Sequence, residues 1–108
     1  MRIFALKSCD TSRKAISAIR AAGHDPQVID VRADGVSDDD RAAILKAFGD
    51  KAINRASTTW RGLSDAEKES DPNDLLAQHP TLMKRPVIDH AGQLYLGWKA
   101  DVQAAILG

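Results

Sequence analysis

A strand, a helix and a second strand follow one another within the first part of the chain, and this order constrains the fold most. Residues 2–6 include four consecutive apolar side chains and predict a short buried strand. Over residues 11–22 the apolar side chains recur at helical spacing, and residues 27–31 are rich in β-branched residues. Two strands joined by one helix over so short a span favour a parallel βαβ unit with a right-handed crossover.

The middle of the chain carries signals for helix starts. Ser37 is followed by three aspartates, which suit the positive end of a helix dipole. Ser64 and Glu67 have the spacing of a capping box, and Asp71 precedes Pro72 as an N-cap residue precedes a proline in the first turn. We therefore expect several helices between the βαβ unit and the C-terminal part.

Near its end the chain returns to strands. Residues 87–89 and 94–96 predict a β-hairpin around residues 90–93, and a closing helix follows with Val102, Ala105 and Ile106 facing inward. This order predicts an α/β fold in which helices pack on a small mixed sheet. The 108 residues contain no evident repeat or linker, so we expect a single domain.

Composition excludes several classes of protein. Hydrophobic residues make up 44% and charged residues 28%, which is typical of globular chains rather than disordered ones. Fifteen basic and fifteen acidic residues cancel, so no overall charge attracts nucleic acid. The first apolar stretch ends at Lys7, too early for a signal peptide, and no run approaches the ~18 residues of a membrane span. These features predict a cytoplasmic protein that binds neither nucleic acid nor membrane.

The chain has one cysteine, Cys9, and therefore can form neither an internal disulfide nor a cysteine-cluster zinc site. His24, His79 and His90 lack metal-ligand spacing with one another or with Cys9, so we expect no metal.

Cys9 lies at the predicted junction of the first strand and the first helix, where free backbone N–H groups and the helix dipole favour a thiolate. Lys7 and Arg13 are expected to add positive charge, and the hydroxyls of Thr11 and Ser12 can donate hydrogen bonds to the sulfur. The carboxylate of Asp10, next in the sequence, opposes ionisation of the thiol. A lone cysteine is also often a small buried core residue, and its position alone leaves both interpretations open.

Three ordered motifs resemble the arsenate reductase/Spx family, and most of all its YffB-like branch. They are Leu-Lys-Ser-Cys-Asp-Thr at residues 6–11, Asn-Arg-Ala-Ser-Thr-Thr-Trp at residues 54–60, and His79-Pro80 followed by Arg85-Pro86-Val87. The resemblance covers nearly the whole chain. It implies a thioredoxin-like fold with a mixed four-stranded sheet and a helical insertion, at about residues 37–80, between the βαβ and ββα halves.

The resemblance also implies roles for single residues. Cys9 matches the nucleophile of the family, and Ser12 and Arg13 match the hydroxyl and the arginine that follow it. Arg55 and Arg85 match two arginines that hold oxyanions or glutathione, a task that suits the planar fork of a guanidinium. The alternative for each arginine is a solvated surface position.

One proline and two tryptophans are the remaining residues that bear on the implied site. Thioredoxin-like proteins keep a cis-proline facing the cysteine, so the resemblance predicts a cis Arg85–Pro86 bond beside Cys9. Trp60 and Trp98 are more typical of packing residues, although either could form a wall of a glutathione site.

The chain departs from the arsenate-reducing members at two positions. Where those members carry an arginine in the strand before the last helix, this chain has Leu96-Gly97-Trp98, and where they have a histidine four residues before the cysteine it has Ala5. Spx-type regulators usually carry C-x-x-C, and Ser12 stands where the second cysteine would be.

These observations favour a glutathione-dependent thiol reductase or transferase. Its substrate would be a thiol, disulfide or oxyanion, with glutathione as co-substrate and no tightly bound cofactor. The alternatives are an arsenate reductase coupled to glutathione and glutaredoxin, and a non-catalytic Spx-like regulator that binds a protein partner such as RNA polymerase.

Overall fold

The computed structural model describes all residues, 1–108, and the chain divides into two compact units. The first unit comprises Met1–Asp34 together with Arg85–Gly108, and the second comprises Gly35–Lys84. The helical insertion that we expected at about 37–80 lies inside the second unit.

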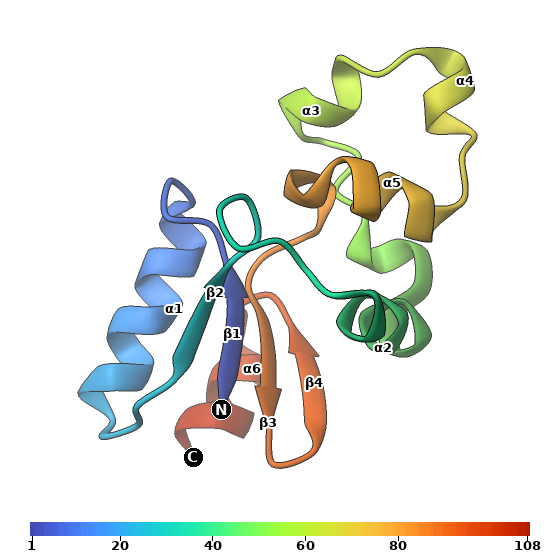
Figure 1. Cartoon of the computed structure of the whole chain (residues 1–108). Coiled ribbons are helices and arrows are strands. Elements are labelled where there is room, and N and C mark those ends of the chain that lie inside the picture. Colours follow the sequence, from blue (N-terminus) through green and yellow to red (C-terminus); the bar gives the residue numbers. More distant parts are fainter. The chain divides into compact units, whose positions relative to one another are not determined.

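The first unit contains a four-stranded sheet in the order β2-β1-β3-β4 (Figure 1). Strand β1 (Arg2–Ala5) pairs in parallel with β2 (Gln27–Asp30), as the βαβ pattern predicts. It pairs in antiparallel fashion with β3 (Val87–His90), which in turn pairs with β4 (Gln93–Leu96). The sheet is therefore mixed, and the fold is of the α/β, thioredoxin-like class.

Helices α1 (Asp10–Ala21) and α6 (Ala100–Leu107) cover one face of this sheet. They bury alternate residues of the strands, because successive side chains of a strand point to opposite faces. One cluster joins side chains from both helices to the central strands: Ile3, Ala5, Ile19, Ile88, Val102 and Ile106. The expectation that Ala105 faces inward is wrong. Only Val102 and Ile106 of α6 are buried, and Ala105 lies on its exposed side.

The β3–β4 hairpin is tighter than its sequence suggests. We expected a loop over residues 90–93, whereas His90 and Gln93 pair with each other and leave a two-residue turn. Ala91 and Gly92 both have positive φ, at 52° and 78°. This is the backbone pattern of the type I′ turns that fit the twist of a hairpin.

The second unit consists of short helices. All three predicted helix starts are confirmed: Ser37 accepts the Asp40 N–H at 3.2 Å, Ser64 and Glu67 form the capping box, and Asp71 accepts the Asn73 N–H at 2.9 Å. The helices are α2 (Asp38–Phe48), η1 (Gly49–Ala52), α3 (Thr58–Arg61), α4 (Asp65–Lys68), α5 (Pro72–Gln78) and η2 (Pro80–Leu82). Across the whole chain, no helix combines the length and the apolarity that crossing a membrane requires.

Candidate active site

Cys9 is the N-cap residue of α1, at the turn that leads out of β1. Its N–H donates to the Leu6 carbonyl at 2.9 Å, and its own carbonyl accepts the Arg13 N–H at 3.0 Å. Both backbone groups of Cys9 are thus fixed, while its side chain is partly exposed rather than enclosed in the core. The arrangement presents the sulfur at the amino end of a twelve-residue helix.

Ser12 lies in the first turn of α1 and has no exposed surface. Its Oγ accepts the Leu6 N–H at 3.4 Å, which holds the hydroxyl beneath the turn. Both the hydroxyl and the backbone N–H of Ser12 hydrogen-bond the Cys9 sulfur. Ser12 therefore connects the end of β1, the start of α1 and the thiol.

Arg85 brings the second part of the site from the other end of the chain. It lies two residues before the first residue of β3, and because β3 lies beside β1 in the sheet, its guanidinium reaches the Cys9 sulfur as a hydrogen-bond donor and as a positive charge. The Arg85–Pro86 peptide bond is cis, which confirms the prediction, and Pro86 is buried. The Pro86 carbonyl accepts the Gly97 N–H at 2.8 Å, which ties this turn to the end of β4.

These contacts shift the ionisation of the thiol. Burial raises the pKa of Cys9, whereas the hydrogen bonds from the Ser12 hydroxyl and N–H, and then the hydrogen bond and charge of Arg85, lower it. The net result is a pKa below the ordinary cysteine value, because hydrogen bonds and positive charge stabilise the thiolate form. Cys9 thus has the environment of a nucleophilic cysteine.

The positive charge at Cys9 differs in origin from the one that we expected. The Arg13 guanidinium forms an ion pair with the Asp10 carboxylate, and the charge of Lys7 acts on the Asp30 carboxylate. Arg85, remote in sequence, supplies the charge that we had assigned to these two neighbours. Thr11 is exposed in the first turn of α1, and the hydroxyl that contacts the sulfur is that of Ser12.

Arg55 and Trp60, the remaining predicted site residues, belong to the second unit. The Arg55 guanidinium carbon lies 5.3 Å from the centre of the Trp60 ring, within cation–π range, and its Nη2 lies 3.6 Å from an Asp50 carboxylate oxygen. Arg55 also lines a cavity of about 440 Å³ together with Lys51 and Lys84. Their part in a reaction at Cys9 stays a prediction.

The structure offers no cluster of three or more histidine, cysteine, aspartate or glutamate side chains that could hold a metal ion.

Both the sequence and the fold of this chain match known proteins. The model of the ArsC family matches residues 4–106, which is almost the entire chain. The protein belongs to the ArsC family. An uncharacterised protein of Haemophilus influenzae is also 33% identical over 109 residues, covering 95% of this chain and 96% of the relative.

Solved structures of ArsC-family proteins and related chains have the same fold. The YFFB protein is 29% identical, superposes with a TM-score of 0.90, and the match covers 99% of this chain and 98% of that one. An arsenate reductase-related protein from Brucella melitensis is 29% identical with a TM-score of 0.72, over 95% of this chain and 91% of that one. The arsenate reductase from Vibrio cholerae, at 21% identity and a TM-score of 0.77 over 98% of each chain, shares the fold.

Proposed function

We propose that this ArsC-family protein is a glutathione-dependent thiol oxidoreductase that acts through Cys9 alone. The observation that supports this proposal most strongly is the convergence of Ser12 and Arg85 on a partly exposed sulfur at the start of a helix. Membership in the ArsC family supports thiol-based reduction in general terms. The chain has no second thiol to resolve an adduct on Cys9, so an external thiol is needed, and we assign this role to glutathione.

In the proposed first step, the Cys9 thiolate attacks the glutathione sulfur of a mixed disulfide. The Cys9–glutathione S–S bond forms as the substrate S–S bond breaks, and the substrate leaves as a thiolate that takes a proton from solvent. The cationic Arg85 guanidinium holds an anionic group of the incoming molecule through charge-assisted hydrogen bonds.

In the second step, a glutathione thiolate attacks the glutathione sulfur of the adduct. This attack forms oxidised glutathione and returns Cys9 as a thiolate, which the Ser12 and Arg85 contacts stabilise as the leaving group. The two steps together exchange one disulfide for another: the mixed disulfide and one glutathione thiol become the free substrate thiol and oxidised glutathione. The pKa of Cys9 thus matters twice, once for attack and once for departure.

A glutathione-coupled assay on a glutathionylated peptide tests this proposal. We expect turnover by the wild-type chain and none by Cys9→Ser, because a serine hydroxyl fills the space without supplying a thiolate at neutral pH. Incubation with oxidised glutathione followed by intact-mass measurement should show one glutathionyl group per wild-type chain and none on Cys9→Ser. Wild-type protein that forms no adduct and shows no turnover would contradict the proposal.

The rival proposal is an Spx-like protein that binds a partner without catalysis. The same assay separates the two, because a binding module has no turnover with or without Cys9. Ser12 also removes the C-x-x-C pair on which redox regulation of Spx-type proteins usually depends, so the sequence favours the oxidoreductase.

A further inference from the structure

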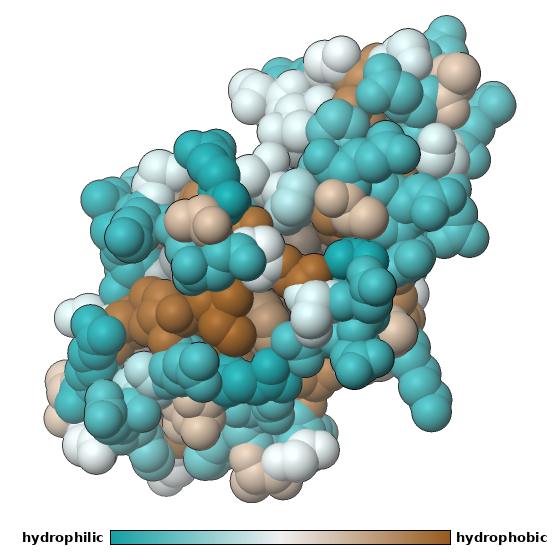
Figure 2. Space-filling view, viewed as in Figure 1, coloured by the Kyte–Doolittle hydropathy of each residue, from teal (hydrophilic) through white to brown (hydrophobic).

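A groove lies between α1 and β2, and we call it the α1–β2 groove; Cys9 is not among its lining residues. All of its lining residues belong to the first unit, and it encloses about 540 Å³, within the range of small-molecule sites. Ile16 of α1 and Val28 of β2 form its apolar floor. Figure 2 shows the corresponding hydrophobic patch, bordered by hydrophilic side chains, at the position that α1 and β2 occupy in Figure 1.

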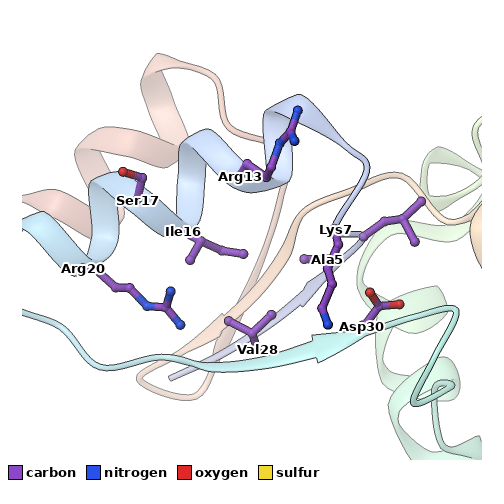
Figure 3. A pocket seen from close by; sticks show the side chains of 9 residues that line it. Ala5, Lys7, Arg13, Ile16, Ser17, Arg20, Val28 and Asp30 are labelled. Carbon is purple, nitrogen blue, oxygen red and sulfur yellow. The ribbon is translucent and has the colours of Figure 1, made fainter.

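Cationic side chains stand at both ends of this floor. Figure 3 shows the Arg20 guanidinium at one end and the Lys7 ammonium at the other, with Ile16 and Val28 between them. Arg13 also lines the groove, but its guanidinium forms the ion pair with Asp10 and points away from β2.

The two ends of the groove differ in how their charges are balanced. At one end the charge of Lys7 acts on the Asp30 carboxylate, which the groove itself contains. At the other end the exposed Arg20 guanidinium forms no ion pair within the chain. An anion is therefore favoured at the Arg20 end, and the acidic Asp30 disfavours a second anionic group at the far end.

We propose that the α1–β2 groove binds an organic carboxylate that carries an apolar tail. The carboxylate would accept two parallel hydrogen bonds from Arg20, whose planar fork matches its two oxygens. The tail would cover Ile16 and Val28, removing partly exposed apolar surface from water. This inference goes beyond the proposed thiol chemistry and does not depend on it, because Cys9 does not line the groove.

The test uses the full chain and a fluorescent fatty acid, 11-(dansylamino)undecanoic acid. We expect saturable one-to-one binding, with decanoate displacing the probe at a concentration about tenfold lower than that of decanol, because only decanoate pairs with Arg20. Amide chemical-shift changes on adding decanoate should lie on α1 and β2. An unbound probe, equal displacement by decanol, or shift changes confined to other elements would each overturn the inference.

Substitutions on one helix provide the matched comparison. Arg20→Glu should weaken probe binding about tenfold or more, and Arg20→Gln should weaken it to a smaller extent. Lys14→Glu reverses the same charge at an exposed position of α1 that does not line the groove, and binding should stay within about twofold of wild type. Equal effects of Lys14→Glu and Arg20→Glu on probe binding would show that binding depends on the overall charge of the chain, and would contradict a specific site at Arg20.

A Cys9→Ser chain separates this inference from the proposed function. It should bind the probe as the wild type does, even though it lacks the thiol. Loss of probe binding in this variant would place the probe at the cysteine rather than in the α1–β2 groove, and the inference would then be wrong.

Discussion

Three residues determine the reactivity of the single cysteine. Cys9 and Ser12 lie one helical turn apart, and Arg85 reaches them through the pairing of β1 with β3. Burial opposes ionisation of the thiol, but the hydrogen bonds and the guanidinium charge outweigh it. The thiolate is therefore stabilised by contacts that a substitution can remove one at a time.

The first prediction concerns the titration of Cys9. Because the pKa of the thiol is lowered, the rate of iodoacetamide alkylation should rise to half its maximum at a pH below the free-cysteine value of about 8.5. Below that midpoint the thiol is protonated and the rate falls, and above it the rate reaches a plateau. Alkylation reactions quenched at fixed times and analysed by intact-mass measurement give the pH profile of the rate. Alkylation only after denaturation would show that the thiol is inaccessible and contradict the prediction.

The second prediction assigns the positive charge to Arg85. Arg85→Ala removes a hydrogen bond and a charge from the thiolate, so the alkylation midpoint should move to higher pH and the rate at pH 7 should fall about three- to tenfold. Arg13→Ala removes an arginine that pairs with Asp10, and we expect a smaller shift. The same pH profile, measured on both variants, checks this order, and a larger shift for Arg13→Ala would reverse the assignment.

At the scale of the elements, Asp30 closes the end of β2. Its carboxylate accepts the N–H groups of Arg32 and Ala33, both at 2.9 Å, and its own N–H donates to the Asp34 carboxylate at 2.9 Å. The hydrogen bond from Ala33 lowers the pKa of Asp30 most, with burial acting in the opposite direction and the Arg32 and Lys7 contacts adding to the lowering. The turn after the edge strand thus depends on one buried, ionised side chain.

The third prediction is that Asp30→Ala destabilises the fold by about 1–3 kcal/mol at pH 7, because two backbone donors lose their acceptor. The folded-state pKa of Asp30 lies below its unfolded value, so its ionic contribution is present above about pH 3.9 and is lost as the pH falls through the folded-state pKa. Urea unfolding at pH 7 and at pH 3 should therefore show a smaller difference between variant and wild type at the lower pH. Asp30→Asn, which keeps an acceptor oxygen, is the matched control and should be less destabilised at pH 7.

Elements that depend on local signals were predictable from the sequence, and contacts between distant segments were not. The capping hydroxyls and carboxylate of Ser37, Ser64 and Asp71 predicted the starts of three helices. Each cap could be recognised in the sequence because it acts on backbone groups within three residues. The sequence predicted a longer hairpin loop than the structure has, because alanine rarely adopts the positive φ that Ala91 has in this turn. The charge at Cys9 was assigned to sequence neighbours for a related reason. Spacing along the chain does not predict which strand pairs with β1, so it could not place Arg85 beside Cys9. The prediction of a role for Arg85 rested only on the family resemblance.

At the scale of the whole molecule, the family fold extends over nearly the full chain, whereas the family resemblance leaves one anion-binding position without its arginine. The match to the ArsC family model covers residues 4–106 and therefore includes the turn between β1 and α1 that carries Cys9. By the family resemblance, Leu96-Gly97-Trp98 replaces the segment in which arsenate-reducing members carry a further arginine, and its central residue is Gly97. It adopts φ of 85°, a backbone conformation that side chains with a Cβ rarely adopt. The chain therefore has the family fold, and under the proposed function Cys9 acts as the nucleophile without one anion donor that the resemblance assigns to arsenate-reducing members.

The fourth prediction follows from this loss: arsenate reduction should be weak or absent even with glutathione and glutaredoxin supplied. Arsenate is small and multiply charged, so its capture depends on several convergent donors, and loss of one charged hydrogen bond costs about 1.5–3 kcal/mol. At ~1.4 kcal/mol per factor of ten, this corresponds to roughly a ten- to hundredfold loss in capture. A glutathionylated peptide and arsenate, compared in the same NADPH-coupled assay, provide an internal control, because both reactions need the Cys9 thiolate but only arsenate needs the missing donor. Robust arsenate turnover that disappears in Cys9→Ser would show that the remaining arginines suffice, and that Gly97 does not exclude this substrate.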